Sequence, residues 1–264
     1  NWVENCWVQT ANPIDCSAEP FVSISLETRY RCWDNGSSDD SEKCLIEISR
    51  DGVNWPDIST FSIEDGTVDY GEGPIQSRWE VFEGYGTGDQ RDNPTIAEFD
   101  ITEAAGGQET IWIRFRWAGT WGYSWEIDDI QVYATPANDT RIDNYASYTN
   151  YLQTGVYEYG AWPQSQIPTD LEAGVKVYNS GYEPQSGVQI QLDHNGTADM
   201  SATIDLAYQA YDTLTTPYQP TGLGDVEINY TLIDDNGDEN PSNYTLTQGF
   251  EITEYSGGRD NGFI

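Results

Sequence analysis

Apolar and polar residues alternate along much of the chain, and this alternation predicts strands. In the run 111–117, every odd-numbered residue is apolar, whereas Arg114 and Arg116 belong to the opposite face. A period of two residues is typical of a strand with one buried face. Similar runs predict strands at residues 21–26, 45–49, 78–82, 95–101 and 125–133. Because no long segment shows the helical period, the chain is predicted to be all-β.

The apolar pattern changes phase inside the predicted strand 125–133. Its apolar residues are odd-numbered up to Ile127 and even-numbered from Ile130 onwards. A strand changes phase in this way through an extra residue, so we predict a β-bulge at Asp128 and Asp129. Two adjacent carboxylates on a bulge either lie in solvent or hold a cation.

The two halves of the chain differ in their loops. The first half separates its strands by long loops rich in Gly, Asp and Asn, which fits a double-sheet jelly roll. The second half has about seven short strands with regular alternation, which fits an immunoglobulin-like sandwich. A polar, proline-bearing segment at 134–140 separates them and is typical of a linker. We therefore predict a jelly-roll β-sandwich at residues 1–136 followed by an immunoglobulin-like β-sandwich at residues 137–264.

The charge of the chain excludes several classes of partner. The 264 residues include 45 acidic and 11 basic side chains, for a net charge of −34. The first 136 residues hold 26 acidic and 8 basic residues, and the remainder hold 19 and 3. A field of this sign repels nucleic acid and anionic membranes. No apolar run approaches the ~18 residues of a membrane span, so no membrane insertion is expected.

Four cysteines lie within the first 44 residues, at positions 6, 16, 32 and 44. Three pairings are possible, and we favour Cys6–Cys16 and Cys32–Cys44. The second pair flanks a turn-rich stretch between two predicted strands, where a disulfide staples a hairpin. Zinc is the alternative, but the spacings lack the close pairs of zinc sites. Disulfides predict an extracellular or cell-surface location.

Catalytic patterns are weak in this sequence. His194 is the only histidine, and its predicted place in a hairpin turn is a poor position for a Ser-His-Asp triad. The clustered His or Cys ligands of a zinc hydrolase are absent. A pair of carboxylates for glycoside hydrolysis stays open, because 45 acidic residues always offer a pair. We therefore expect the chain not to be an enzyme.

Three segments of the first half form a pattern, namely 47–55, 112–116 and 121–130. Their order and separation resemble the MAM-like jelly-roll modules of secreted multidomain proteins, especially those that marine Bacteroidota export by the type IX system. In the second half, 173–184 and 248–254 resemble CARDB-type immunoglobulin-like domains. The two resemblances imply a segment of a larger secreted protein with flanking domains.

The resemblance also implies a metal ion, because jelly rolls similar to this one often hold one near the last strand. Ca²⁺ takes six to eight oxygen ligands, so Asp128 and Asp129 need further contributors, for which we name Glu19, Asp34 and Asp51. The alternative is a polar bulge whose aspartate accepts a backbone amide. The acidic segment 234–240 faintly resembles a calcium loop, but an Asn-Gly turn explains it better.

Aromatic residues around the predicted last strand of the first half suggest a ligand surface. Trp121 and Tyr123 fall in a loop, where exposed rings can stack on sugars; the alternative is that they cover the edge of the sandwich. The sequence thus predicts a non-catalytic extracellular segment for adhesion or binding of a carbohydrate or protein ligand. The alternatives are accessory domains of a secreted peptidase or polysaccharide hydrolase, and a structural subunit of an extracellular filament or surface layer.

Overall fold

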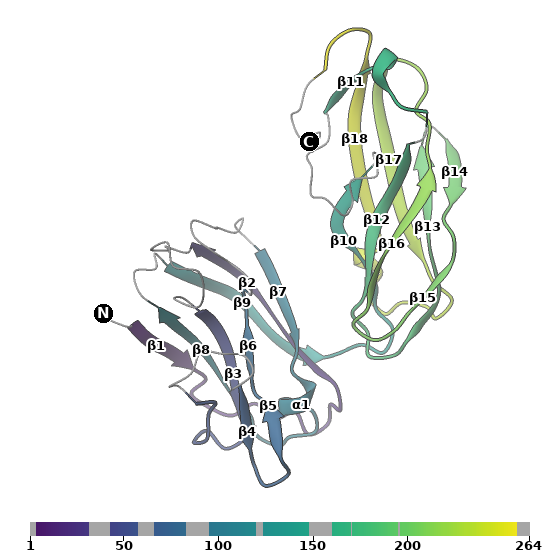
Figure 1. The fold of residues 1–264 in the computed structure, drawn as a ribbon. Coiled ribbons are helices and arrows are strands. Elements are labelled where there is room, and N and C mark those ends of the chain that lie inside the picture. The colour runs from purple at the N-terminus through teal and green to yellow at the C-terminus, as the bar shows by residue number, and fades with distance from the viewer. Residues whose placement is uncertain are drawn as a thin grey trace. The chain divides into compact units, whose positions relative to one another are not determined.

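The computed structural model divides the chain into two compact units, Asn1–Thr135 and Pro136–Ile264 (Figure 1). Regular structure is almost entirely strand, which confirms the all-β prediction, and the one α-helix among the described residues is the short α1 (Thr102–Ala105). The residues that the structure describes are 4–31, 43–57, 66–82, 95–119, 124–147, 160–169, 171–194 and 196–257.

The first unit is a β-sandwich of two antiparallel sheets. One sheet has the order β1 (Glu4–Gln9), β8 (Trp112–Gly119), β3 (Lys43–Ser49) and β6 (Arg78–Glu80). The other has the order β7 (Thr95–Asp100), β2 (Val22–Arg31) and β9 (Ser124–Ala134), and β4 (Thr67–Asp69) pairs with β5 (Pro74–Gln76). The chain crosses repeatedly from one sheet to the other, as in a jelly roll.

The core of the first unit lies between its two sheets. Ile24 and Leu26 of β2 face Ile46 and Ile48 of β3 across it, and all four are fully buried. Each pair is separated by one residue of the opposite face, so the two-residue period of the sequence correctly identified the buried positions.

The predicted bulge is present in β9. Ser25 of β2 pairs with Gln131 and Glu27 pairs with Asp128, so two residues of β9 lie opposite one residue of β2. Asp129 has a positive φ of 45°. The extra residue therefore shifts the phase of β9 as the sequence indicated.

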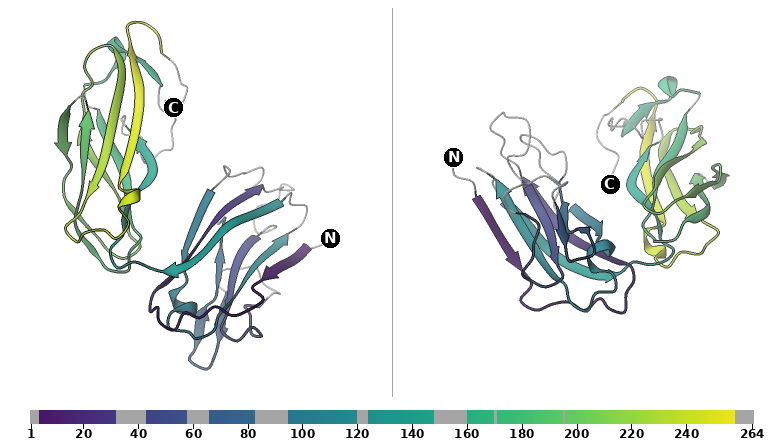
Figure 2. Two further views of the ribbon diagram at one scale, coloured as in Figure 1. Left: turned by 180° about the vertical axis from the view of Figure 1, so that it is seen from behind. Right: turned by 60° about the horizontal axis from the view of Figure 1, so that its bottom comes forward.

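The second unit is also a sandwich (Figure 2). Its smaller sheet has the order β10 (Thr140–Ser147), β12 (Glu172–Asn179) and β16 (Tyr211–Pro217). The larger sheet has the order β11 (Ala161–Pro163), β18 (Thr245–Thr253), β17 (Gly224–Ile233), β13 (Gln185–His194) and β14 (Thr197–Met200), with β15 (Ile204–Leu206) also paired to β13. Two 3₁₀ turns, η2 (Gln164–Gln166) and η3 (Pro241–Asn243), complete it.

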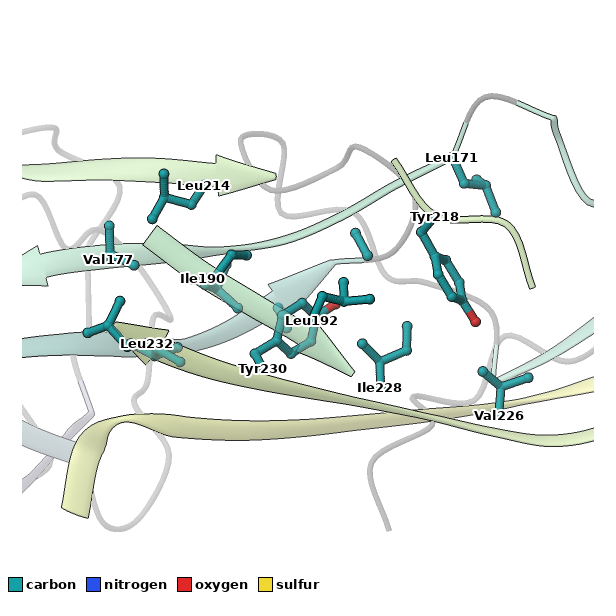
Figure 3. Close-up of a cluster of buried hydrophobic side chains, with 14 of the residues drawn as sticks. Leu171, Val177, Ile190, Leu192, Leu214, Tyr218, Val226, Ile228, Tyr230 and Leu232 are labelled. Atoms are coloured by element: carbon teal, nitrogen blue, oxygen red, sulfur yellow. The ribbon is translucent and has the colours of Figure 1, made fainter. Parts of the chain in front are cut away.

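A single apolar layer joins the two sheets of the second unit. Figure 3 shows Val177 and Leu214 of the smaller sheet near Ile190, Leu192 and other residues of the larger one. Because the inward side chains of β12 fill this layer, its alternate side chains belong to the outer face of the smaller sheet. That outer face carries the site described next.

Candidate functional site

Three side chains form a row across the smaller sheet of the second unit. Arg141 of β10 pairs with Tyr178 of β12, and Tyr178 pairs with Tyr211 of β16. Residues directly opposite one another in a sheet lie on the same face. Lys176 precedes Tyr178 by two residues on β12 and shares that face. Val177, between them, is fully buried in the core.

These residues line a pocket, which we call the basic pocket: Arg141, Lys176, Val177, Tyr178 and Tyr211. Its volume is about 300 Å³, at the lower end of the ~300–1,000 Å³ that small-molecule sites occupy. Since the backbone of three paired strands holds its walls, the pocket is built on rigid elements rather than on loops.

The side chains of the basic pocket contribute different chemical groups to a ligand. The Arg141 guanidinium carbon lies 4.9 Å from the centre of the Tyr178 ring, which is a cation–π contact. Lys176 forms no ion pair within the described part of the chain. Tyr211 is 75% exposed, so its ring lies open to solvent beside the two cations. The pocket therefore combines fixed positive charge with an accessible aromatic face.

The positive charge of this pocket stands out against the composition of its unit. Residues 137–264 contain 19 acidic and 3 basic side chains, and Arg141 and Lys176 are two of those three. The third, Arg259, lies outside the described residues. Two of the three basic residues of the second unit therefore line this one pocket.

Sequence reasoning missed this pocket. The alternation of β12 revealed its buried face, but β10 and β16 were not predicted as strands that flank it. The usable signal was the scarcity of basic residues in the second half. A basic residue on the outer face of a strand in such an acidic sequence is a candidate for anion binding. Only the register of the three strands shows that Arg141 and Lys176 converge.

The predicted calcium ligands that the structure describes do not gather into one cluster. Within the described ranges, no group of three or more His, Cys, Asp or Glu side chains is placed to hold a metal. Asp128 and Asp129 are exposed, and Asp128 Oδ1 accepts the backbone amide of Asp129 at 2.9 Å. The alternative interpretation, a polar bulge closed by a local hydrogen bond, describes these two residues.

Of the further contributors, Glu19 lies away from the bulge. Glu19 precedes β2, whereas Asp128 pairs with Glu27, more than five residues further along that strand. At ~3.3 Å per residue, this separation exceeds ~16 Å, too far for a shared ion. Asp34 lies outside the described residues.

Asp51 has a structural role in the loop that follows β3. Its Oδ1 accepts the backbone amides of Val53 at 2.8 Å and Asn54 at 2.7 Å and the Ser49 hydroxyl at 3.0 Å. Burial alone raises the pKa of the Asp51 carboxyl, but the hydrogen bonds from Asn54, Val53 and Ser49 outweigh it and hold the pKa below its usual value. The carboxylate therefore closes a turn.

The predicted sugar-stacking residues Trp121 and Tyr123 lie outside the described residues. Their neighbour Trp125 belongs to the core of the first unit. Its indole nitrogen donates to Thr28 Oγ1 at 2.8 Å, and its ring packs edge-on against Phe115 at 6.2 Å. For Trp125, the core interpretation thus holds.

The Cys6–Cys16 disulfide is not formed, and this prediction is wrong. Cys6 lies opposite Trp117 in the β1–β8 pair, whereas Ile14, two residues before Cys16, bridges to Ile111. Six residues of β8 separate the two levels, or ~20 Å, while a disulfide needs Cα atoms within ~7 Å. Cys44 is buried in β3, but Cys32 lies outside the described residues, so the second pair stays a prediction.

The acidic segment 234–240 forms a turn. Asp234 Oδ1 accepts the backbone amides of Asn236 and Gly237 at 2.9 and 2.8 Å, and its other oxygen accepts the hydroxyls of Thr140 and Tyr244, both at 3.0 Å. Gly237 has a positive φ of 76°. The turn interpretation therefore explains this segment, and Asp234 ties it to the start of β10.

A second charged cluster is buried in the first unit. Glu47 of β3 accepts hydrogen bonds from Arg78, Arg114 and Arg116 at 3.0, 2.7 and 2.9 Å. Glu47, Arg78 and Arg116 have no exposed side-chain surface. The cluster joins the sequence segments 47–55 and 112–116, because Arg114 also stacks 4.2 Å from the ring of Trp55. It is closed to ligands and holds the sheet together.

Comparison with known proteins gives distant likenesses only. No protein-family model and no curated protein matches the chain. The CARDB domain of a Pyrococcus furiosus protein, solved in complex with di-metal ions, is similar at 19% identity and a TM-score of 0.35, over 45% of this chain and 91% of that one. Its solution structure gives 20% identity and a TM-score of 0.33, over 46% and 98%.

A GH2 β-galacturonidase from Eisenbergiella tayi, solved bound to galacturonate, is similar at 10% identity and a TM-score of 0.34, over 94% of this chain and 35% of that one. Among the described residues, no helix has the length and hydropathy that a membrane span requires.

Proposed function

We propose that the chain is a non-catalytic, ligand-binding segment of a larger secreted or cell-surface protein, and that the basic pocket holds an anionic group of the ligand. The observation that carries the proposal is the convergence of Arg141 and Lys176 with two tyrosines on one outer sheet face. A few cations and aromatic rings in a preformed hollow are the usual composition of a recognition site.

The chemistry of the described lining favours binding over catalysis. It consists of a guanidinium, an ammonium, two phenols and a buried valine, and contains no carboxylate, thiol or imidazole. A reaction by general acid–base catalysis needs a group that exchanges a proton near the working pH. Fixed cations such as Arg141 stay charged and hold an anion in place.

In this proposal the second unit carries recognition. The sequence alone assigned that role to loops of the first unit, with the second as a rigid spacer. An accessory role in a secreted hydrolase shares the same binding step and differs only in the flanking domains. The carbohydrate or protein nature of the ligand is addressed by the experiment below.

The extracellular location is part of the proposal and depends on the predicted Cys32–Cys44 disulfide. Because Cys6 and Cys16 are separate thiols, the denatured protein should present two reactive thiols, and reduction should expose two more. Four reactive thiols without reduction would remove this support, since a reduced set is typical of the cytoplasm.

Calcium stays a prediction for Asp128 and Asp129. Any ion that binds the folded state alone raises the melting temperature by mass action. If a chelator leaves that temperature unchanged, the ion is removed from the proposal.

The test of the proposal is binding of the 264-residue chain to an array of neutral and anionic glycans and peptides. The comparison is between the wild type, Lys176→Gln and the charge-preserving Lys176→Arg. We expect ligands that Lys176→Gln loses and Lys176→Arg retains. Tyr255→Ala is a matched control, because Tyr255 is 85% exposed and lies outside the pocket. Identical binding by the wild type and Lys176→Gln would contradict the proposal.

A further inference from the structure

We infer that the group held in the basic pocket is a carboxylated sugar residue of a glycan. The inference rests on the proposed function and adds the chemical class of the ligand. Three features of the pocket lead to it: the pair of cations, the acidic surroundings, and the exposed ring of Tyr211.

The two cations suit a single carboxylate. Arg141 lies opposite Tyr178, and Lys176 is the diagonal neighbour of Arg141 on the next strand, a position ~7–8 Å away across a sheet. Two long side chains at that separation can converge on one anionic group. Lys176, which forms no ion pair within the described part of the chain, supplies an ammonium group for a charge-assisted hydrogen bond to a carboxylate.

The acidic surroundings limit how many charges the ligand carries. The second half holds 19 acidic residues against 3 basic ones, so the unit as a whole repels a polyanion with dense charge. Nucleic acids, polyphosphates and heavily sulfated glycans carry such dense charge. A glycan with isolated carboxylates, or with one at its end, avoids this repulsion.

The exposed ring favours a sugar over an acidic peptide. Tyr211 is 75% exposed and lies in the same row as the stacked pair of Arg141 and Tyr178. An aromatic ring beside a cation can pack against the apolar C–H face of a pyranose while the carboxylate of that sugar meets the cations. The side chain of Asp or Glu has a carboxylate but no ring face. A volume of about 300 Å³ suits one or two sugar rings.

The experiment is an NMR titration of the full ¹⁵N-labelled chain at constant ionic strength. The probes are sodium glucuronate, galacturonate and N-acetylneuraminate, with glucose, sodium acetate and sodium glutamate for comparison. We expect at least one sugar acid to shift the amides of residues 141, 176, 178 and 211 at a concentration about tenfold below that of acetate or glutamate. Glucose should leave these amides unchanged.

Two variants test the ionic contact and the ring contact of the pocket separately. Lys176→Gln should weaken binding of the sugar acid by on the order of tenfold through the lost charge-assisted contact. Tyr211→Ala should weaken sugar-acid binding severalfold and leave acetate binding unchanged. Tyr255→Ala, which removes an exposed ring outside the pocket, should change neither.

The possible failures are distinguishable. If acetate and glutamate shift the pocket amides as strongly as the sugar acids, the pocket is a general anion site; the inference is overturned and the proposed function stands. If Tyr211→Ala weakens acetate and sugar acids equally, the stacking argument is overturned. If no carboxylate shifts the pocket amides, both the inference and the pocket itself are overturned.

Discussion

At the scale of the residue, Glu47 compensates the buried positive charge of three arginines. One carboxylate accepts hydrogen bonds from Arg78, Arg114 and Arg116 in a site without solvent access. Breaking a buried ion pair by removing one partner leaves charge without compensation and typically costs ~3–5 kcal/mol.

We therefore expect Glu47→Gln to lower the free energy of unfolding of the first unit by roughly 3 kcal/mol or more, measured by urea denaturation. Glu109→Gln is the control, because Glu109 is exposed and should change that free energy by less than ~0.5 kcal/mol. A Glu47→Gln variant as stable as this control would show that the cluster is not a structural centre.

Asp51 makes the stability of its loop depend on pH. Its pKa is lowered in the folded protein, so its ionised form is favoured by folding. This contribution is complete above the unfolded value of ~3.9 and is lost as the pH falls through the folded pKa.

Asp51→Asn should consequently lower the melting temperature at pH 7, with a cost of about 1 kcal/mol for weakened turn hydrogen bonds. The difference from the wild type should shrink as the pH falls below ~4. Asp128→Asn, on the exposed bulge, is the comparison. A difference for Asp51→Asn that stays constant from pH 7 to pH 3 would contradict the assigned role of the carboxylate.

At the scale of the element, the sequence predicted what depends on neighbours in the chain. The alternation along β2 and β12 identified their buried faces, and the phase change of β9 revealed its bulge. These features follow from the two-residue period of a strand, which neighbouring residues in the sequence already show. In β3 and β8 the second face is buried as well, because Glu47, Arg114 and Arg116 form the charged cluster there, and the alternation did not predict this.

The basic pocket was not predictable from such patterns. It depends on the register between Arg141, Tyr178 and Tyr211, which come from strands as much as 70 residues apart. The prediction of a Cys6–Cys16 disulfide was wrong for the same reason. The two thiols are close in sequence, but the chain runs ~20 Å along β8 between them.

Close approach of strands explains one glycine on the outer face of β12. A Cβ at Gly174 would lie 2.3 Å from the carbonyl oxygen of Leu214 and 2.8 Å from a Thr215 methyl. Since backbone must move to relieve the first contact, Gly174→Ala should separate β12 from β16 and disturb the pocket.

We expect Gly174→Ala to lower the free energy of unfolding by ~1–3 kcal/mol, as overpacking does, and to weaken ligand binding through the displaced Tyr211. Gly249→Ala is the matched strand control, because its Cβ would meet nothing closer than 3.5 Å. Thermal unfolding of both variants measures the difference, and equal stability would contradict the strand spacing.

At the scale of the whole molecule, charge dominates. A net charge of −34 on 264 residues places like charges near one another on both units, and this repulsion opposes the folded state. Added salt screens it, since the Debye length falls from ~30 Å at 0.01 M to ~10 Å at 0.1 M.

The melting temperature should therefore rise between 0.01 and 0.3 M NaCl, while binding at the basic pocket weakens over the same range because the contact is ionic. Differential scanning calorimetry and ligand titration measure the two trends. A melting temperature that falls with salt would mean that attractive ion pairs outweigh the net repulsion.

In the proposed function, Arg141 and Lys176 form a recognition site on a unit that is otherwise acidic in composition. The most direct measurement is the paired comparison of wild type, Lys176→Gln and Lys176→Arg on one array of neutral and anionic ligands. We expect anionic ligands that the wild type and Lys176→Arg bind and that Lys176→Gln no longer binds. An unchanged binding profile in Lys176→Gln would show that the pocket is not where this protein meets its ligand.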